Sequence, residues 1–70
     1  MIPIMLAEKG GHKVLKLAVE DKVRKHLENL GIMQGMDIDI ISNGNGVIIL
    51  KVKEGRVAIN RDLAGKIFVD

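Results

Sequence analysis

The sequence predicts a small, mainly β domain: a barrel of about five short strands with one inserted amphipathic helix and a short C-terminal helical turn. Three observations lead to this fold class. Several short runs alternate apolar and polar residues at period two, and Asn and Gly residues that favour turns separate them. One stretch in the first half changes to helical spacing. Closure into a barrel would pair the strand edges that a small open sheet leaves exposed.

Length and composition limit the kind of protein. The chain of 70 residues forms a single domain, residues 1–70. Apolar residues make up 47% of it, and the core must be aliphatic because Phe68 is the only aromatic residue. The absence of cysteine excludes disulfides, thiolate-bound zinc and iron–sulfur clusters, and it indicates a reducing, intracellular setting.

Membrane insertion and nucleic-acid binding are not expected. No apolar run approaches the roughly 18 residues that a spanning helix needs. The apolar stretch Met1–Ala7 is too short for a secretion signal, so we expect it to be part of the fold. A formal net charge of +2 is too weak for a nucleic-acid footprint, and aromatic platforms for stacking bases are lacking.

The first strand is expected at residues 12–19, after a turn at Gly10-Gly11. Period-two spacing places Leu15, Leu17 and Val19 on the inner side of this strand.

The helix is predicted at residues 21–30, with its ends uncertain by a residue or two. Glu20 and Asp21 stand at its start, where carboxylates favour the positive end of the helix dipole. Gly31 is a left-handed C-terminal cap, and Ile32 can fold back onto the last turn. The apolar stripe of the helix consists of Val19, Val23, Leu27 and Leu30.

The second half of the chain reads as a meander. After the connector Met33–Gly35, Met36–Ile40 alternates apolar and charged residues and predicts a strand with one wet face. Asn43–Gly46 predicts a hairpin turn, and Val47–Val52 is expected to be the most buried strand. Further elements are a turn at Glu54-Gly55, a strand at Arg56–Ile59, a helical turn Arg61–Ala64 capped by Asn60 and ended by Gly65, and a last strand at Lys66–Val69.

Candidate metal ligands are few. His12 and His26 could join Glu8 or Glu28 around ferrous iron or zinc. The two histidines lie on different predicted elements, however, and His26 and Glu28 do not share a helix face. We therefore interpret both histidines as solvent-facing side chains and assign no metal site and no cofactor.

Catalysis is not expected either. Asp37 and Asp39 share one face of a strand, but acid–base work needs a cleft and a raised pKa. The opposite face of that strand is apolar, so these carboxylates should face water. We predict no enzyme.

Two features favour a docking role. The basic residues Lys22, Arg24 and Lys25 form the best electrostatic patch of the chain, with Arg24 also able to pair with Glu28. Flexible methionine side chains beyond the helix, Met33 and Met36, could form an adaptable contact surface, although filling gaps in the core is the more ordinary role of such residues.

The segment Leu27–Ile38, LENLGIMQGMDI, resembles the signature of the FeoA family, ferrous iron transport protein A. That signature is a helix ending in Leu-x-x-Leu-Gly-Ile/Leu, followed by a spaced Gly that opens an alternating strand. Gly10–Val19 resembles the first strand of the family, and Arg56–Ile59 and Ile67–Val69 resemble its last two. The resemblance covers residues 8–70.

This resemblance implies an SH3-like barrel with an inserted helix, in a cytoplasmic bacterial protein without catalysis of its own. It also implies a partner, the cytosolic region of the ferrous iron transporter FeoB. The same fold occurs as the C-terminal domain of metal-dependent repressors related to the diphtheria toxin repressor. The chain lacks the helix-turn-helix and dimerisation parts of those proteins, so a free-standing FeoA-type protein is preferred.

The leading hypothesis is therefore an accessory or regulatory protein of ferrous iron uptake that binds FeoB. Its docking surface is expected to involve Leu30, Gly31, Ile32, Met33, Gly35 and Met36, with Lys22, Arg24 and Lys25 as steering charges. The alternative is a metal-sensing or regulatory SH3-like domain that uses His12, His26 and nearby carboxylates. Exposed strand ends also make a homodimer conceivable.

Overall fold

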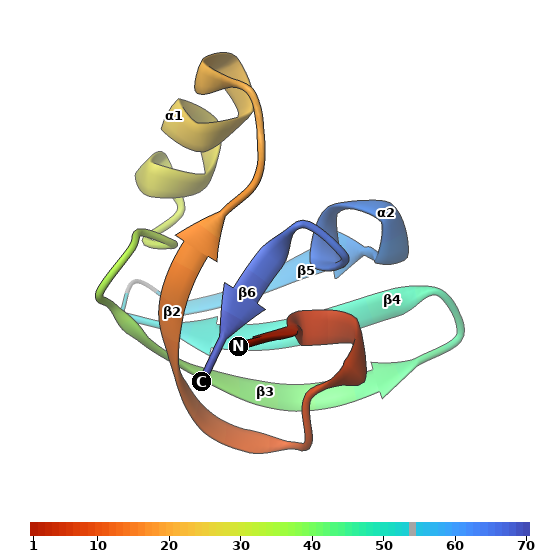
Figure 1. Cartoon of the computed structure of the whole chain (residues 1–70). Coiled ribbons are helices and arrows are strands. Elements are labelled where there is room, and N and C mark those ends of the chain that lie inside the picture. Colours follow the sequence, from red (N-terminus) through yellow and green to blue (C-terminus); the bar gives the residue numbers. More distant parts are fainter. Residues whose placement is uncertain (54) are drawn as a thin grey trace.

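The computed structural model describes residues 1–53 and 55–70, and within these residues it contains six strands, one α-helix, one 3₁₀ turn and one short helical turn (Figure 1). In chain order these are β1 (Ile2–Pro3), η1 (Ile4–Leu6), β2 (Gly10–Leu17), α1 (Asp21–Asn29), β3 (Asp37–Gly44), β4 (Val47–Val52), β5 (Gly55–Asn60), α2 (Arg61–Ala64) and β6 (Ile67–Val69). The predicted mainly β class, with a helix and a C-terminal helical turn, is confirmed. No helix among the described residues is long and apolar enough to cross a bilayer.

The strands form one antiparallel sheet in the order β1-β6-β2-β3-β4-β5, which curls into a barrel (Figure 1). One strand more than expected is present because the N-terminal stretch pairs with the far end of the chain, Ile2 with Val69 and Pro3 with Phe68. Ile4, directly after β1, is fully buried. The apolar stretch at the N-terminus is thus part of the fold. Strands β1 and β5 remain the two edges, so the ladder of the described strands does not close.

Strand β2 corrects the predicted inner face. Val14 and Leu17 are buried, whereas Leu15 is only half-buried and Val19 lies beyond the strand. The cause is a bulge: the register against β6 shifts between Val14 and Lys16. An extra residue on one strand reverses the inside–outside alternation beyond it.

The β3–β4 hairpin is confirmed at Asn43–Gly46. Gly44 pairs with Val47, and the two residues between them, Asn45 (φ 54°) and Gly46 (φ 80°), have the positive φ angles of a type I′ turn. Strand β4 buries one face only, because Val47 at its start is 42% exposed. Three of its six residues are buried, the largest number in any described strand, so the expectation that it is the most buried strand holds by number of buried residues. Of the predicted turn at Glu54-Gly55, Gly55 opens β5, and Glu54 lies outside the described residues.

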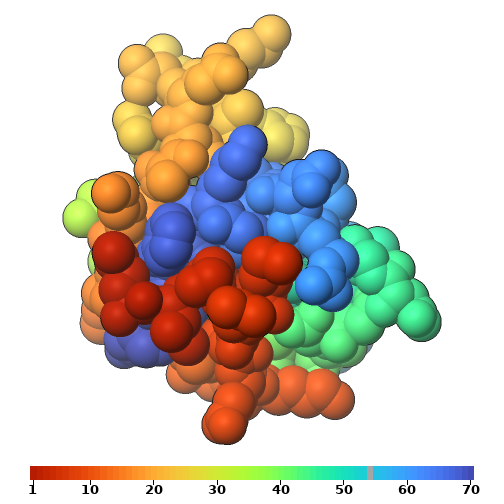
Figure 2. Space-filling model, turned by 45° about the vertical axis from the view of Figure 1, so that its right-hand side comes forward, coloured from red at the N-terminus to blue at the C-terminus, as the bar shows by residue number. Residues whose placement is uncertain are grey.

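One aliphatic cluster fills the barrel, as the composition predicts. Helix α1 contributes one fully buried side chain to it, Leu27, while Val19, Val23 and Leu30 along the predicted stripe are half-buried. The helix accordingly projects from the barrel (Figure 2). The Asn60 side chain accepts a hydrogen bond of 2.8 Å from the Leu63 N–H and starts α2 as predicted.

Candidate functional site

The end of helix α1 has the predicted left-handed cap. Leu30 is the last near-helical residue, and Gly31 follows with a φ of 94°. The Gly31 N–H donates to the Glu28 carbonyl at 3.0 Å, and the Ile32 N–H donates to the Leu27 carbonyl at 2.9 Å. This pair of bonds defines a Schellman motif. Because Leu27 and Ile32 are both fully buried in the core, the motif fixes the direction in which the chain leaves the helix.

The connector after this cap is held against strand β2. The Gly35 N–H donates to the Val14 carbonyl at 2.7 Å, and the Val14 N–H donates to the Met36 carbonyl at 2.9 Å. A further bond of 3.1 Å runs from the Met36 N–H to the Met33 carbonyl. The two methionine side chains therefore extend from a fixed backbone, Met33 with 37% of its surface exposed and Met36 half-buried.

A groove of about 580 Å³ opens beside these methionines. We call it the methionine groove; it is lined by Glu28, Asn29, Gly31, Met33, Met36 and Lys53. Its apolar part comes from the methionines, and Glu28 and Lys53 place one charge of each sign on its lining.

The groove contains half of the expected docking residues. Gly31, Met33 and Met36 line it, Leu30 is half-buried, and Gly35 is exposed without lining it. Ile32 is a correction: it is fully buried in the core, since the cap turns its side chain inward, and it offers no surface to a partner.

Three lining residues were missed by the sequence reasoning. Glu28 and Asn29 belong to the last turn of α1 and could have been included by extending the surface back along the helix. Lys53 follows strand β4, far along the chain, and no local pattern connects it to the helix.

The expected basic patch is smaller than predicted. Arg24 bends back along the helix: its Nη1 donates to Asp21 Oδ1 at 2.8 Å, and Nη2 lies 3.4 Å from the Val19 carbonyl oxygen. The expected pairing with Glu28 is therefore wrong. Helical side chains tilt toward the N-terminus, where the Asp21 carboxylate is available. Lys22 and Lys25 remain exposed, three residues apart on one face of α1.

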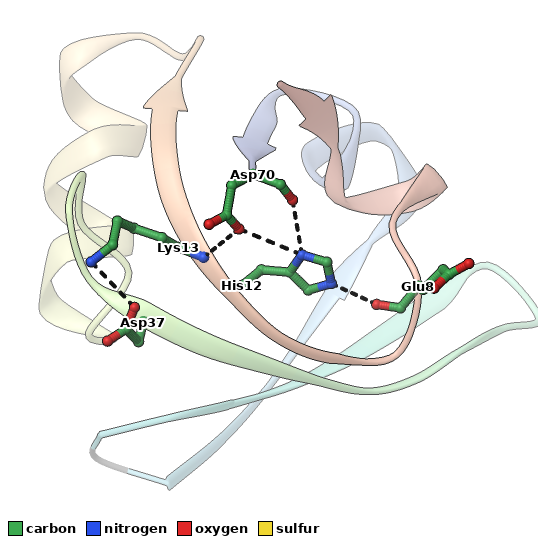
Figure 3. A network of polar contacts seen from close by, with 5 residues as sticks. All are labelled: Glu8, His12, Lys13, Asp37 and Asp70. Atoms are coloured by element: carbon green, nitrogen blue, oxygen red, sulfur yellow. Dashed lines mark hydrogen bonds and ion pairs between the residues drawn. The ribbon is translucent and has the colours of Figure 1, made fainter.

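The two candidate metal ligands lie apart, His12 on β2 and His26 exposed on α1. His12 Nδ1 is 3.0 Å from the backbone oxygen of Asp70, and Nε2 is 2.7 Å from that of Glu8 (Figure 3). These hydrogen bonds raise the pKa of His12 above 6.5. Both ring nitrogens are engaged, so His12 is not the solvent-facing residue expected. Within residues 1–53 and 55–70, no three His, Asp or Glu side chains gather as a metal ion would require.

The aspartate pair on β3 faces water, as predicted. Asp37 and Asp39 are both exposed, and Asp37 Oδ1 lies 3.4 Å from the Lys13 ammonium. A surface ion pair of this kind accounts for the position of Asp37 without a catalytic role.

Comparison with known families decides the assignment. The model of the FeoA domain matches residues 5–70, nearly the whole chain. The chain belongs to the FeoA family. Among curated proteins, this FeoA chain is 32% identical over 71 aligned positions to a protein of Methanocaldococcus jannaschii named "Putative Fe(2+) transport protein A", and the match covers 100% of the chain and 87% of that protein.

Solved structures agree with this assignment. A crystal structure of the iron uptake regulatory protein FeoA superimposes with a TM-score of 0.85 at 27% identity, covering 99% of this chain and 93% of that one. ScaR, solved with bound Zn²⁺, superimposes with a TM-score of 0.90 at 19% identity, and the FeoA chain spans 36% of its length. The second likeness is one of fold alone. The predicted family and SH3-like fold are thus confirmed.

Proposed function

We propose that this FeoA chain is a non-catalytic accessory protein of ferrous iron uptake that acts in the cytoplasm by binding the cytosolic region of a FeoB-type transporter. Its membership of the family and the name of its M. jannaschii relative support the connection with Fe²⁺ transport. The proposed contact is the methionine groove, with Lys22 and Lys25 as steering charges.

The observation that carries this proposal is the presentation of Met33 and Met36 on a backbone fixed by three hydrogen bonds. A pinned loop loses little conformational entropy when a partner binds to it. Methionine side chains adapt to the shape of an apolar partner surface. Glu28 and Lys53 on the lining can orient a polar segment beside that apolar contact.

Titration of the folded chain with the cytosolic region of its cognate FeoB, at low salt, tests the proposal. Met33→Glu should weaken binding by about ten-fold or more, because it places a charge in the apolar contact, and ten-fold corresponds to about 1.4 kcal/mol. Leu6→Glu is the matched control: Leu6 is 70% exposed in η1, lines no part of the groove, and its substitution should leave the affinity unchanged. Absence of binding by the folded wild-type chain would refute the function, and equal losses in both variants would refute the surface.

The steering charges have a separate test. Lys22→Gln combined with Lys25→Gln should slow association at low salt and leave dissociation unchanged. Lys9→Gln combined with Lys51→Gln removes the same charge from other exposed positions and serves as the control. Equal rates in the two double variants would remove the helix lysines from the proposal.

The metal-sensing alternative has less support. The likeness to ScaR is a likeness of fold, and both ring nitrogens of His12 already bond to backbone oxygens.

A further inference from the structure

His12 joins two parts of the chain that are far apart in sequence. Its Nε2 bonds at 2.7 Å to the Glu8 backbone oxygen in the turn before β2, and its Nδ1 bonds at 3.0 Å to the Asp70 backbone oxygen just after β6 (Figure 3). A backbone oxygen can only accept, so each ring nitrogen must carry a proton for both bonds to exist. The geometry therefore requires the imidazolium form.

The surroundings of the ring explain why this form is favoured. His12 pairs with Ile38 of β3, whose side chain is buried, so the imidazole lies on the inner side of the sheet and is only 14% exposed. Directly opposite residues of paired strands share a face. The neighbouring β3 carboxylates, Asp37 and Asp39, consequently lie on the outer face.

The charged groups that face the ring come from the two segments it joins. Asp70 Oδ1 lies 3.7 Å from Nδ1 and is itself held by a 2.9 Å bond from the Lys13 N–H. The Glu8 carboxylate adds a weaker attraction, and the Lys13 ammonium is occupied by Asp37. Both facing charges are negative and favour the imidazolium.

The N-terminal segment, residues 1–7, is also held by apolar contacts, since Ile4 and Ala7 are buried in the core and Met5 packs against it. Strand β1 pairs with β6 at two positions only, and the Asn43 side chain holds the Met5 carbonyl at 3.0 Å. Figure 2 shows this segment (red) lying over the barrel beside the C-terminal residues (blue). His12 ties the turn at the base of this segment to the end of the strand on which the segment pairs.

We propose that His12 is a pH-dependent latch whose imidazolium form fastens the turn at Glu8 to the end of β6 and thereby adds to the contacts that hold the N-terminal segment on the barrel. In the neutral ring, one nitrogen presents a lone pair to a backbone oxygen, and that bond is replaced by repulsion. The latch is therefore closed at low pH and opens as the pH rises.

The direction of the effect follows from linkage. The backbone bonds to Glu8 and Asp70, in that order, raise the pKa of His12 above 6.5, and partial burial opposes them. A group whose pKa is raised by folding stabilises the fold fully below its unfolded pKa, and this contribution is lost as the pH rises through the folded pKa. Stability should thus fall as the pH rises from about 6.5, the unfolded pKa of His, through the higher folded value.

The first test is an NMR titration of the wild-type chain, which needs no variant. The His12 ring should titrate above pH 6.5 and show both nitrogens protonated below its midpoint. A midpoint at or below 6.5 would overturn the latch.

The second test measures amide hydrogen exchange to find which part of the chain opens when the His12 bonds are lost. The exchange rates are corrected for intrinsic base catalysis. Between pH 6 and pH 8, the amides of Ala7 and Asp70, which bond to Ile4 and Lys13, should lose protection several-fold more than the Gly31 amide at the helix cap. In the His12→Gln variant, the Ala7 and Asp70 amides should no longer lose more protection than the Gly31 amide. The His26→Gln variant, the matched control on exposed helix surface, should still show this difference. If amide protection depends on pH in the same way in the wild type and in His12→Gln, the proposal is refuted.

Discussion

Replacement of Gly31 by alanine tests whether the cap sets the stability of the helix end. Gly31 has a φ of 94°, in the region that L residues avoid. A side chain in that left-handed conformation costs roughly 1–2 kcal/mol. For a domain of 60–100 residues, 1 kcal/mol corresponds to about 4–8 °C in Tm, so Gly31→Ala should lower Tm by roughly 4–16 °C.

This loss is large for a chain of this size. At roughly 0.05–0.15 kcal/mol per residue, the total stability should be about 4–10 kcal/mol. A loss of about 1–2 kcal/mol at Gly31, with no core side chain removed, would be the size expected from its backbone conformation.

Gly44→Ala is the control for this experiment. Gly44 has no positive φ, and a Cβ built on it meets no other atom within 4 Å. An alanine there restricts the unfolded chain without straining the folded one, so Gly44→Ala should be neutral or more stable by up to about 1 kcal/mol.

Denaturant unfolding followed by circular dichroism measures both variants. The midpoint of Gly31→Ala should fall with an unchanged m-value, which shows that stability and not the extent of unfolding has changed. If Gly31→Ala unfolds at the wild-type midpoint, or if Gly44→Ala loses as much as Gly31→Ala, the argument from backbone strain is refuted.

Three further substitutions are measured by the same unfolding assay. Leu27→Ala removes the one fully buried side chain of α1 and should cost about 2.7–5 kcal/mol, with the helix losing its most buried contact with the barrel. Asn60→Ala deletes the acceptor for the Leu63 N–H and should cost about 0.5–2 kcal/mol; a smaller loss would mean that water replaces the cap. Asp21→Asn removes the exposed partner of Arg24 and should change stability by less than about 0.5 kcal/mol, so a larger loss would contradict the surface character of this pair.

The features that the sequence predicts well are governed by neighbouring residues. The hairpin at Asn43–Gly46 and the cap at Gly31 depend on which residues tolerate positive φ. The Asn60 cap depends on an acceptor three residues before an orphan N–H. Each of these preferences acts within a few residues, so a single sequence contains the information needed.

The wrong or missing predictions concern partners that are distant in the chain. Strand β1 exists because Ile2 meets Val69, which no local periodicity reveals. The inner face of β2 changes because a bulge forms against β6. Lys53 reaches the methionine groove from the position directly after β4. The contacts of His12 are of the same kind, since one of its two acceptors follows the last strand.

The residues that identify the family and the residues of the methionine groove have different physical roles, and this separates two classes of variant. Leu27 and Ile32 are buried, and Gly31 supplies a backbone angle, so the signature chiefly specifies how the chain leaves the helix. Substitutions there should lower stability and the proposed binding to FeoB together, because the connector loses its position. Substitution of the exposed Met33 should lower binding at unchanged stability. If Met33→Glu destabilises the fold as much as Gly31→Ala does, the methionine is a structural residue and the groove loses its proposed role.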